Sequence, residues 1–453
     1  MGGYDIFELL HTLFAHWWSE FTDIGAWPDG TFDSVAEYID LYPLVVCLLW
    51  CIYGLNSLIR SLWWQPGPAQ LPAYTVLVPF FAEPERAVRT AHSLDRAYPA
   101  PEEILLIDDG SPTGRGADVL DLAALPARAR VIRLENNGGK AAALNAAIRE
   151  VRSEVVLCLD ADTLLHTPLL DPILARFVAD ATVGAVAGKL WPTEPRSLSD
   201  LMQALDYLAV IGLVKNAEHQ WGGLMTVSGA FVAIRRAALV DVGGWNEATS
   251  AEDIDLSWRL QGAGWRLAYE QRCIAQVEMV PTWRGLWRQR RRWSRGLGHT
   301  VREQFTGALR SGATHLPVCL LTLLGAGWLW AMLAIDALRL GWVAVAVVTG
   351  KSISRPELPS HLFVYIGICF GFFFCQLGIA TLLDRARWRL YPKLFLVAPL
   401  YPLYFWAISL STFIVGFPRG FLRHDRGRWR RTQRAEELTT DAAERSQGEV
   451  SSG

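Results

Sequence analysis

Three apolar runs in this chain are long enough to cross a lipid bilayer, and the first two lie on either side of a long segment of mixed composition. The runs are Leu41–Leu62, Leu316–Ile335 and His361–Leu383. About 20 consecutive apolar residues suffice for a membrane helix. A fourth run, Leu394–Phe417, has the length but contains Pro399 and Pro402. We therefore expect α-helical transmembrane segments that bracket one soluble domain of about 250 residues.

The composition supports a membrane protein. Hydrophobic residues make up 51% of the 453 residues, and the mean hydropathy is +0.19. Such a chain is too apolar for an ordinary soluble globule of this length. The segment Tyr4–Phe21 is apolar but carries acidic and histidine side chains, so it predicts an interfacial amphipathic helix and not a cleaved signal peptide.

The charged residues predict which side of the membrane the soluble domain faces. Acidic residues precede the first apolar run, whereas arginines crowd residues 284–302, before the second. Because positive charge favours the cytosolic side, we expect the soluble domain and the loop from Arg385 to Lys393 in the cytosol. To keep the basic tail that follows Arg419 inside as well, the last apolar run is predicted to be bent by its prolines and partly re-entrant. Residues 432–453 are predicted to be disordered.

These features predict five regions along the chain. Residues 1–63 form an N-terminal amphipathic segment and a transmembrane helix, and residues 64–280 form the soluble domain. Interfacial helices follow at 281–315, then a C-terminal transmembrane bundle at 316–417 and a basic, then disordered, tail at 418–453.

The soluble domain alternates short apolar runs with helix-like stretches. The predicted strands are Thr75–Pro79, Ile104–Asp108, Val131–Leu134, Val155–Asp160 and Val183–Leu190. Continuously apolar strands separated by helices predict an α/β fold with a mostly parallel sheet and helices on both faces. Ligands of such sheets bind beyond the carboxyl ends of the strands.

Polar motifs lie at these strand ends. Asp109, in the sequence DDGS, is a candidate contact to the base or ribose of a nucleotide, although the same residues suit an Asx-type turn. Lys140 opens an alanine-rich segment, and the start of a helix attracts an anion such as phosphate. A Gly-Gly-Lys sequence is equally typical of an ordinary helix start.

Asp160 and Asp162 form an acidic pair directly after a predicted strand. Side chains two residues apart in an extended backbone point to the same side, and adjacent carboxylates repel each other unless a cation lies between them. Mg²⁺ or Mn²⁺ would relieve this repulsion and would also hold a diphosphate. A solvated turn is the alternative interpretation.

Three acids cluster at the start of a further predicted helix: Glu252, Asp253 and Asp255. Acids in this position stabilise the positive end of the helix dipole and can serve as caps alone. The functional interpretation makes Asp253 a general base, because a sugar hydroxyl is a poor nucleophile and needs a carboxylate to take its proton.

A Trp/Arg-rich stretch covers residues 283–295. Helical spacing puts Gln289, Arg292 and Trp293 on one face. That face offers an amide, a guanidinium for a diphosphate and an aromatic surface for a pyranose ring. Three other arginines are expected to contact anionic lipid heads: Arg290, Arg291 and Arg295. A basic amphipathic helix lying on the membrane explains the composition without a ligand site.

The motifs follow one another in the order DDG, GGKAAALN, DAD, AED and QRRRW. This order resembles the processive branch of glycosyltransferase family 2, which includes cellulose, chitin and hyaluronan synthases. Longer stretches are similar to bacterial poly-β-1,6-N-acetylglucosamine synthases: IGLVK (211–215), TVSG (226–229), EDIDLSWRLQ (252–261) and GLWRQRRRW (285–293). The resemblance covers roughly residues 40–430. Ala251 stands where the family commonly has Thr, which bears on how an acceptor is held.

The resemblance implies a GT-A fold and a role for each motif. Asp253 is the catalytic base, with Glu252 beside it, and Asp162 is the ligand of Mg²⁺ or Mn²⁺. The nucleotide-sugar site comprises Asp109, Lys140, Asp160, Asp162, Gln289, Arg292 and Trp293, the last three at its diphosphate and acceptor end.

The activity implied by the resemblance is inverting polymerisation of N-acetylglucosamine from UDP-GlcNAc into a β-linked, β-1,6, exopolysaccharide at the bacterial inner membrane. The expected partners are UDP-GlcNAc, the growing polysaccharide, the lipid bilayer and a small membrane accessory subunit, with no nucleic acid. The sequence leaves open a hyaluronan, chitin or cellulose-type synthase. A non-processive lipid-linked sugar transferase and a non-catalytic membrane scaffold or transporter are the competing functions.

Overall fold

The computed structural model describes residues 45–46, 48–59, 70–221, 223–311, 348, 360–384 and 389–422. The chain divides into two compact units. One consists of Cys47–Leu323 with Phe370–Gly453, and the other of Met1–Val46 with Leu324–Cys369. Several predicted segments lie outside the described residues: Tyr4–Phe21, Leu316–Ile335, residues 385–388 and residues 423–453.

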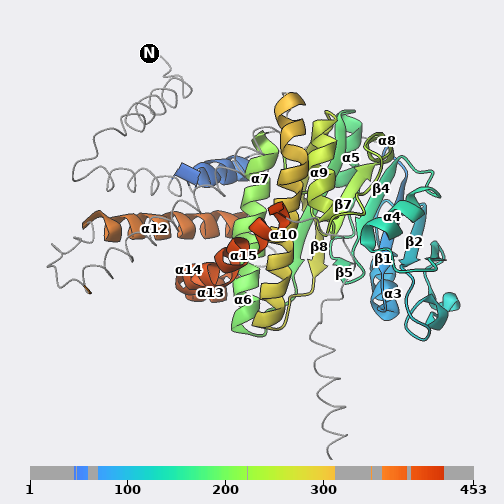
Figure 1. The fold of residues 1–453 in the computed structure, drawn as a ribbon, viewed down its shortest axis with the longest axis horizontal. Coiled ribbons are helices and arrows are strands. Elements are labelled where there is room, and N and C mark those ends of the chain that lie inside the picture. The colour runs from blue at the N-terminus through green and yellow to red at the C-terminus, as the bar shows by residue number, and fades with distance from the viewer. Residues whose placement is uncertain are drawn as a thin grey trace, which may run out of the picture. The chain divides into compact units, whose positions relative to one another are not determined.

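An eight-stranded sheet forms the centre of the larger unit, with its strands in the order β3-β2-β1-β4-β7-β6-β8-β5 (Figure 1). Its strands are β1 (Tyr74–Phe80), β2 (Glu103–Asp108), β3 (Ala129–Arg133), β4 (Val155–Leu159), β5 (Thr163–Leu165), β6 (Val183–Pro192), β7 (Phe231–Arg235) and β8 (Arg266–Val277). All five predicted strands are present. β1 and β4 are buried at every position, as their unbroken apolar sequences indicate.

The sheet combines two directions of pairing. β1 pairs in parallel with β2 and β4, β2 pairs in parallel with β3, and β6 pairs in parallel with β8. β7 runs antiparallel to β4 and β6, and β5 runs antiparallel to β8. The sheet is therefore mixed, where the sequence predicts a mostly parallel one, because the unpredicted strands β5 and β7 reverse direction.

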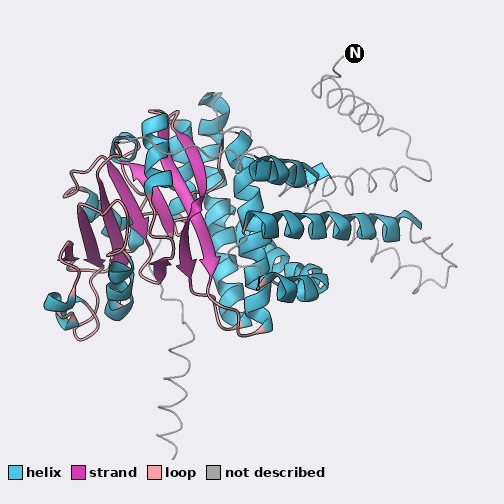
Figure 2. Cartoon of the chain, turned by 180° about the vertical axis from the view of Figure 1, so that it is seen from behind, coloured by secondary structure: helices cyan, strands magenta, loops and turns pink. Residues whose placement is uncertain are grey.

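Helices cover both faces of the sheet, as predicted (Figure 2). Val76 and Val78 of β1 lie in one core with α3 (Pro84–Ser93) and α5 (Asp171–Ala179). Leu77 between them lies in the opposite core with α4 (Lys140–Ile148), α8 (Arg236–Asp241) and α9 (Glu252–Gly262). The alternation follows from the period of two along a strand, and each fully buried side chain of this size contributes about 1.5–3 kcal/mol.

The remaining helical segments complete the described structure. Short 3₁₀ turns lie at Ala117–Val119, Leu122–Ala124 and Ala398–Leu400. α6 (Leu198–Leu205) continues through the π-helix η3 (Asp206–Ile211) into α7 (Gly212–Trp221). The others are α10 (Trp283–Ser311), α12 (Ser360–Leu383), α13 (Tyr391–Val397), α14 (Tyr401–Tyr404), the π-helix η6 (Phe405–Leu410) and α15 (Ser411–Leu422).

α10 and α15 pack closely because glycines remove side chains where the two helices meet. A Cβ added at Gly420 would lie 1.8 Å from the backbone oxygen of Arg295, and one added at Gly298 would lie 2.2 Å from that of Phe417. No side chain fits into such gaps, so the glycines set the distance between the helices.

Among the described residues, one helical segment is long and apolar enough to cross a bilayer, Tyr391–Leu422. It contains the predicted run Leu394–Phe417, and its 3₁₀ turn Ala398–Leu400 coincides with Pro399, where a missing N–H interrupts the α-helical hydrogen bonds. Two shorter apolar helices are Leu48–Ile59 and Phe370–Leu383.

Candidate active site

A cavity of about 490 Å³ lies where strand ends and helix starts meet. Eight of the nine residues that the sequence analysis selects line it: Lys140, Asp160, Asp162, Glu252, Asp253, Gln289, Arg292 and Trp293. They come from α4, the loop after β4, α9 and α10. Segments more than 150 residues apart in the chain, from Lys140 to Trp293, therefore share one site.

Asp109 is the selected residue that does not line the cavity. Its carboxylate is fully buried and accepts hydrogen bonds from the amides of Gly138 at 3.0 Å and Gly139 at 2.8 Å. Burial raises the pKa of Asp109, and these two hydrogen bonds partly offset the rise. Asp109 thus fixes the loop that leads into α4, and its contact to a nucleotide stays a prediction.

Lys140 opens α4 and extends its ammonium group into a cluster of acids. The Nζ atom forms an ion pair with Asp160 and lies 3.3 Å from Glu252 Oε1, and it donates to the carbonyl of Gly229 at 3.2 Å. Burial alone would lower the pKa of Lys140, but the surrounding carboxylates of Asp160, Glu252 and Asp253 raise it above the ordinary value. The side chain therefore keeps its positive charge within the cavity.

Asp160 and Asp162 have the chemistry of a site for a divalent cation. Burial raises the pKa of Asp160 to about 6, and the neighbouring Asp162 contributes to the rise while Lys140 opposes it. Among the residues that the structure describes, no group of three or more His, Cys, Asp or Glu side chains is placed to hold a metal. Mg²⁺ commonly binds through one or two carboxylates plus substrate phosphates, so the pair fits a cation that arrives with a diphosphate.

Asp253 lies in the first turn of α9, with its carboxylate at the cavity wall. Oδ2 accepts a hydrogen bond from the amide of Gly229 at 3.0 Å, and Oδ1 accepts one from the amide of Ile254 at 2.9 Å. Ala251 before the helix provides no side-chain cap. Backbone amides thus orient the carboxylate that the sequence predicts as a general base.

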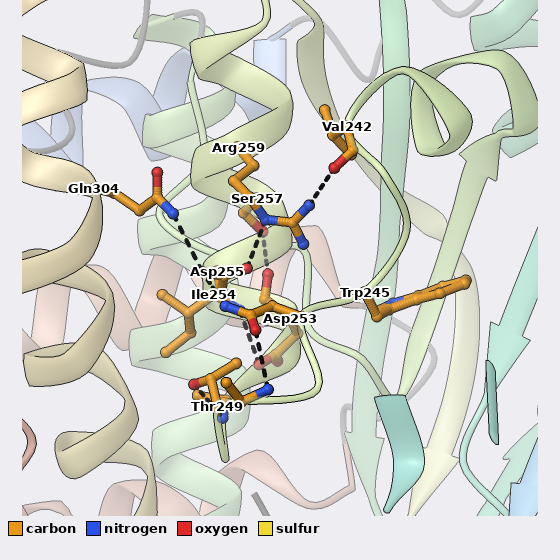
Figure 3. A network of polar contacts seen from close by, with 12 residues as sticks. Val242, Trp245, Thr249, Asp253, Ile254, Asp255, Ser257, Arg259 and Gln304 are labelled. Atoms are coloured by element: carbon orange, nitrogen blue, oxygen red, sulfur yellow. Dashed lines mark hydrogen bonds and ion pairs between the residues drawn. The ribbon is translucent and has the colours of Figure 1, made fainter. Parts of the chain in front are cut away.

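Asp255, two residues along, does not line the cavity, and its side chain points to Arg259 and Gln304 (Figure 3). It is fully buried and accepts hydrogen bonds from Arg259 Nε at 2.7 Å, Asn246 Nδ2 at 3.3 Å and Gln304 Nε2 at 3.4 Å. The acids of α9 thus divide between a structural residue, Asp255, and two cavity residues, Glu252 and Asp253.

The turn before β7 joins these elements. Ser257 of α9 accepts a hydrogen bond from the amide of Val227 at 3.0 Å. Ser228 has a φ of +60°, a conformation that non-glycine residues rarely adopt. Because β7 is antiparallel to β4, the turn ends beside Asp160, whose amide lies 3.4 Å from the carbonyl of Ala230. Strain of this kind often marks functional sites.

α10 presents Gln289, Arg292 and Trp293 to the cavity, as the helical spacing predicts. The Arg292 side chain is exposed, with Nη1 3.5 Å from the carbonyl of Ser250. The expectation that Arg290 contacts lipid heads is wrong. Its guanidinium is buried, forms an ion pair with Asp206 at 2.9 Å and lies 4.3 Å from the centre of the Trp293 ring.

α7 contributes two charged side chains that the sequence analysis did not select. Lys215 and Glu218 both line the cavity. Lys215 belongs to the stretch IGLVK that carries the family resemblance, but its charge within an apolar segment gave no sign of a role. Only the packing of α7 against the sheet shows that both side chains point inward.

The fold and the cavity together define an enzyme that transfers sugars, a glycosyltransferase with a GT-A-like fold. Residues 72–296 match the family described as glycosyltransferase like family 2. Over these residues the chain is similar to that family. The match covers the whole sheet and ends just after the QRRRW sequence of α10.

The chain is similar to curated bacterial synthases over most of its length. It is 26% identical to the poly-beta-1,6-N-acetyl-D-glucosamine synthase of Staphylococcus epidermidis over 87% of this chain and 96% of that protein. It is 30% identical to the enzyme of the same name from Staphylococcus aureus over 58% of this chain and 66% of that protein. A solved mannosyltransferase from Pyrobaculum calidifontis, in complex with GDP-Man and Mn²⁺, aligns with a TM-score of 0.45 and 22% identity, covering 75% of this chain and 97% of that one.

Proposed function

We propose that the protein is a membrane-embedded, processive and inverting glycosyltransferase that polymerises N-acetylglucosamine from UDP-GlcNAc into a β-1,6-linked exopolysaccharide. One observation carries the proposal. A single cavity contains the oriented carboxylate of Asp253 and the acidic pair Asp160 and Asp162, which suits a cation bound to a diphosphate. The same cavity contains the amide, guanidinium and indole side chains of α10. The names of the Staphylococcus relatives support the choice of sugar and linkage.

Asp253 would act as the general base. The acceptor hydroxyl gives its proton to the carboxylate as its oxygen attacks the anomeric carbon of the donor. A new C–O bond forms on one face of the sugar while the bond to the diphosphate breaks on the other, so an α-linked donor yields a β-linked product. The Gly229 amide, 3.0 Å from Oδ2, would hold the carboxylate in position for this proton transfer.

Two cationic side chains would offset the charge of the departing UDP. Arg292 is exposed at the cavity and has a guanidinium that can form two parallel bonds to a phosphate. Lys140 keeps its charge beside Asp160. Asp162, supported by Asp160, would hold Mg²⁺ or Mn²⁺, which supplies further positive charge to the diphosphate when bound.

Exposed apolar side chains support an embedded enzyme. Helix Leu48–Ile59 and segment Tyr391–Leu422 carry large hydrophobic residues open to solvent: Leu48, Ile52, Leu55, Leu396, Leu400, Leu403, Phe405 and Trp406. Apolar surfaces of this kind mark membrane or protein contacts. We place the enzyme in the bacterial inner membrane as a multi-pass protein with a cytosolic catalytic domain, where it would help to translocate the polymer and bind a small membrane accessory subunit.

The test is synthesis by the purified full-length protein in lipid nanodiscs. UDP-GlcNAc, UDP-glucose and UDP-glucuronate are supplied singly and in pairs, with Mg²⁺ or Mn²⁺, and the product is analysed for length and linkage. A long β-1,6-linked polymer from UDP-GlcNAc alone is expected. A polymer that needs another sugar would indicate a hyaluronan or cellulose-type synthase. A single sugar on lipid, or no product, would reject processive synthesis.

A further inference from the structure

α7 forms a wall of the cavity on which an ammonium and a carboxyl group lie one helical turn apart. Ile211, at the end of η3, and Val214, Lys215 and Glu218 of α7 all line the cavity. The spacing of three and four residues puts them on one face of the helix. Two apolar side chains followed by two charged ones make a surface suited to a sugar, which has apolar ring faces and polar edges.

The Lys215 ammonium is anchored beside the catalytic carboxylate. Lys215 is buried, and its Nζ donates to the hydroxyl of Ser228. The next residue, Gly229, donates its amide to Asp253 at 3.0 Å. The left-handed backbone of Ser228 directs its side chain to α7 and the Gly229 amide to α9. Lys215 is thereby tied to the turn that orients the base.

Glu218 is hydrogen-bonded to the segment between α7 and β7, which also contains Ser228. Its Oε2 accepts a hydrogen bond from the amide of Met225 at 3.1 Å, and Met225 also lines the cavity. In the part of the chain that the structure describes, this is the one hydrogen bond to the Glu218 carboxylate. A carboxylate oxygen can accept more than one hydrogen bond, so Glu218 retains capacity for a ligand.

The pKa values of both groups lie near neutral pH. Burial lowers the pKa of Lys215 to about 8, against the opposing effect of Glu218 and Asp253. Burial raises the pKa of Glu218 to about 7, which the Met225 amide and Lys215 partly offset. A ligand that supplies hydrogen bonds to these two buried groups lowers the free energy of the complex, because a buried polar group without hydrogen bonds is costly.

We propose that Lys215 and Glu218 form the subsite that recognises the polar groups of the acceptor's terminal sugar, resting on the glycosyltransferase function proposed above. The ammonium donates to a ring hydroxyl or acetamide oxygen, and the carboxylate accepts from a hydroxyl. The donor's diphosphate has its own groups in Lys140, Asp160 and Asp162. The α7 pair thus selects the acceptor and aligns its attacking hydroxyl with Asp253.

The test separates acceptor binding from donor binding. Lys215→Met and Glu218→Gln are compared with the wild type in nanodiscs, using N-acetylglucosamine oligosaccharides as acceptors. Three quantities are measured: the KM for the acceptor, the affinity for UDP, and the slow hydrolysis of UDP-GlcNAc by water without acceptor. We expect the acceptor KM to rise about tenfold or more, while UDP affinity and hydrolysis stay within about twofold. Lys393→Met and Glu85→Gln, which remove matching charges at exposed positions, should leave all three unchanged.

An acceptor series identifies the recognised hydroxyl. Oligosaccharides whose terminal unit lacks one hydroxyl at a time should be poorer acceptors for the wild type at one position. That discrimination should largely disappear in Glu218→Leu, whose side chain cannot accept a hydrogen bond from either acceptor. Lys215→Arg keeps the positive charge and serves as the conservative variant. Melting curves of each variant recorded with UDP check that the fold is intact.

The outcomes are distinct. An unchanged acceptor KM in both folded variants overturns the subsite. A parallel loss of UDP affinity also overturns it, because the pair would then belong to the donor site. If the wild type transfers sugar to no oligosaccharide and makes no polymer, the proposed function itself fails before any variant is compared.

Discussion

Arg290 donates a hydrogen bond from Nη2 to the buried carboxylate of Asp206 over 2.9 Å. The same carboxylate accepts the hydroxyls of Tyr401 and Tyr404, each at 2.5 Å. Asp206 therefore connects the helix that carries QRRRW to η3 and to the C-terminal apolar segment. The aromatic ring of Trp293 lies against the same guanidinium, 4.3 Å from its centre, so the cluster also holds a cavity residue.

Replacing Arg290 by Met should destabilise the enzyme strongly. The substitution leaves the buried Asp206 carboxylate without its cation, and loss of one partner of a buried pair costs about 3–5 kcal/mol. We expect a much shorter half-life of activity on mild heating, together with a lower rate because Trp293 loses its support. Tyr404→Phe removes one of three donors and should cost about 1 kcal/mol. Equal stability of Arg290→Met and the wild type would contradict the role of the cluster.

Adding a methyl group at Gly420 should force α10 and α15 apart. The new Cβ would lie 1.8 Å from the backbone oxygen of Arg295, which cannot move without shifting α10. Overpacking of this kind costs about 1–3 kcal/mol, and we expect Gly420→Ala to lose heat resistance and activity. Gly378→Ala on α12 is the matched control, since its Cβ meets no atom within 4 Å, and it should be neutral.

The strands β1, β2 and β4 were predictable from their sequences, whereas β8 was not. β1, β2 and β4 are read directly from their sequences, because every side chain is apolar or lies at a strand end. β8 contains the buried Glu270 and the partly exposed Arg272, whose side chains pair at 2.7 Å. Charged residues within a strand interrupt the apolar pattern on which a strand prediction depends, so β8 was missed.

The same distinction holds for the site. Asp160, Asp162 and Asp253, which line the cavity, could be selected from the sequence because acids at strand ends or helix starts stand out against their apolar surroundings. Asp206 and Lys215 lie within helices, and their partners are distant in the chain: Arg290 lies 84 residues beyond Asp206, and Ser228 lies 13 residues beyond Lys215. Their roles depend on tertiary packing and are not visible in local spacing.

The stability gained by Glu218→Gln should depend on pH. The carboxyl of Glu218 titrates at 4.5 in an unfolded chain, but burial raises its pKa to about 7 in the fold. Between these values the folded state binds the extra proton, so the wild type loses stability as the pH rises. The neutral Gln avoids this loss. The melting-temperature difference between variant and wild type should grow in the variant's favour from pH 4.5 to 7 and then level off. A difference that stays constant across this range would contradict a raised pKa.

Asp162→Asn should weaken the response to metal. An amide oxygen carries no full charge, so the pair that would hold Mg²⁺ or Mn²⁺ loses half of its negative charge. We expect chelation to stop polymer synthesis by the wild type, and the Mn²⁺ concentration that restores half of the activity to rise about tenfold or more in Asp162→Asn. The exposed Asp95 provides the control, since Asp95→Asn should regain half of its activity at the same Mn²⁺ concentration as the wild type. Full activity of the wild type in excess chelator would reject the metal requirement.

Asp253→Asn and Asp255→Asn should fail in different ways, although only one residue separates them. Asp253 faces the cavity and would take the acceptor's proton, so its amide variant should lose about 10²- to 10⁴-fold in rate. Its UDP affinity and melting temperature should change little, because an amide can still accept from Gly229. Asp255 is committed to Arg259, Asn246 and Gln304 (Figure 3). Its variant should lower the melting temperature first and the rate only through unfolding. Polymer synthesis by a folded Asp253→Asn variant at the wild-type rate would assign the base elsewhere.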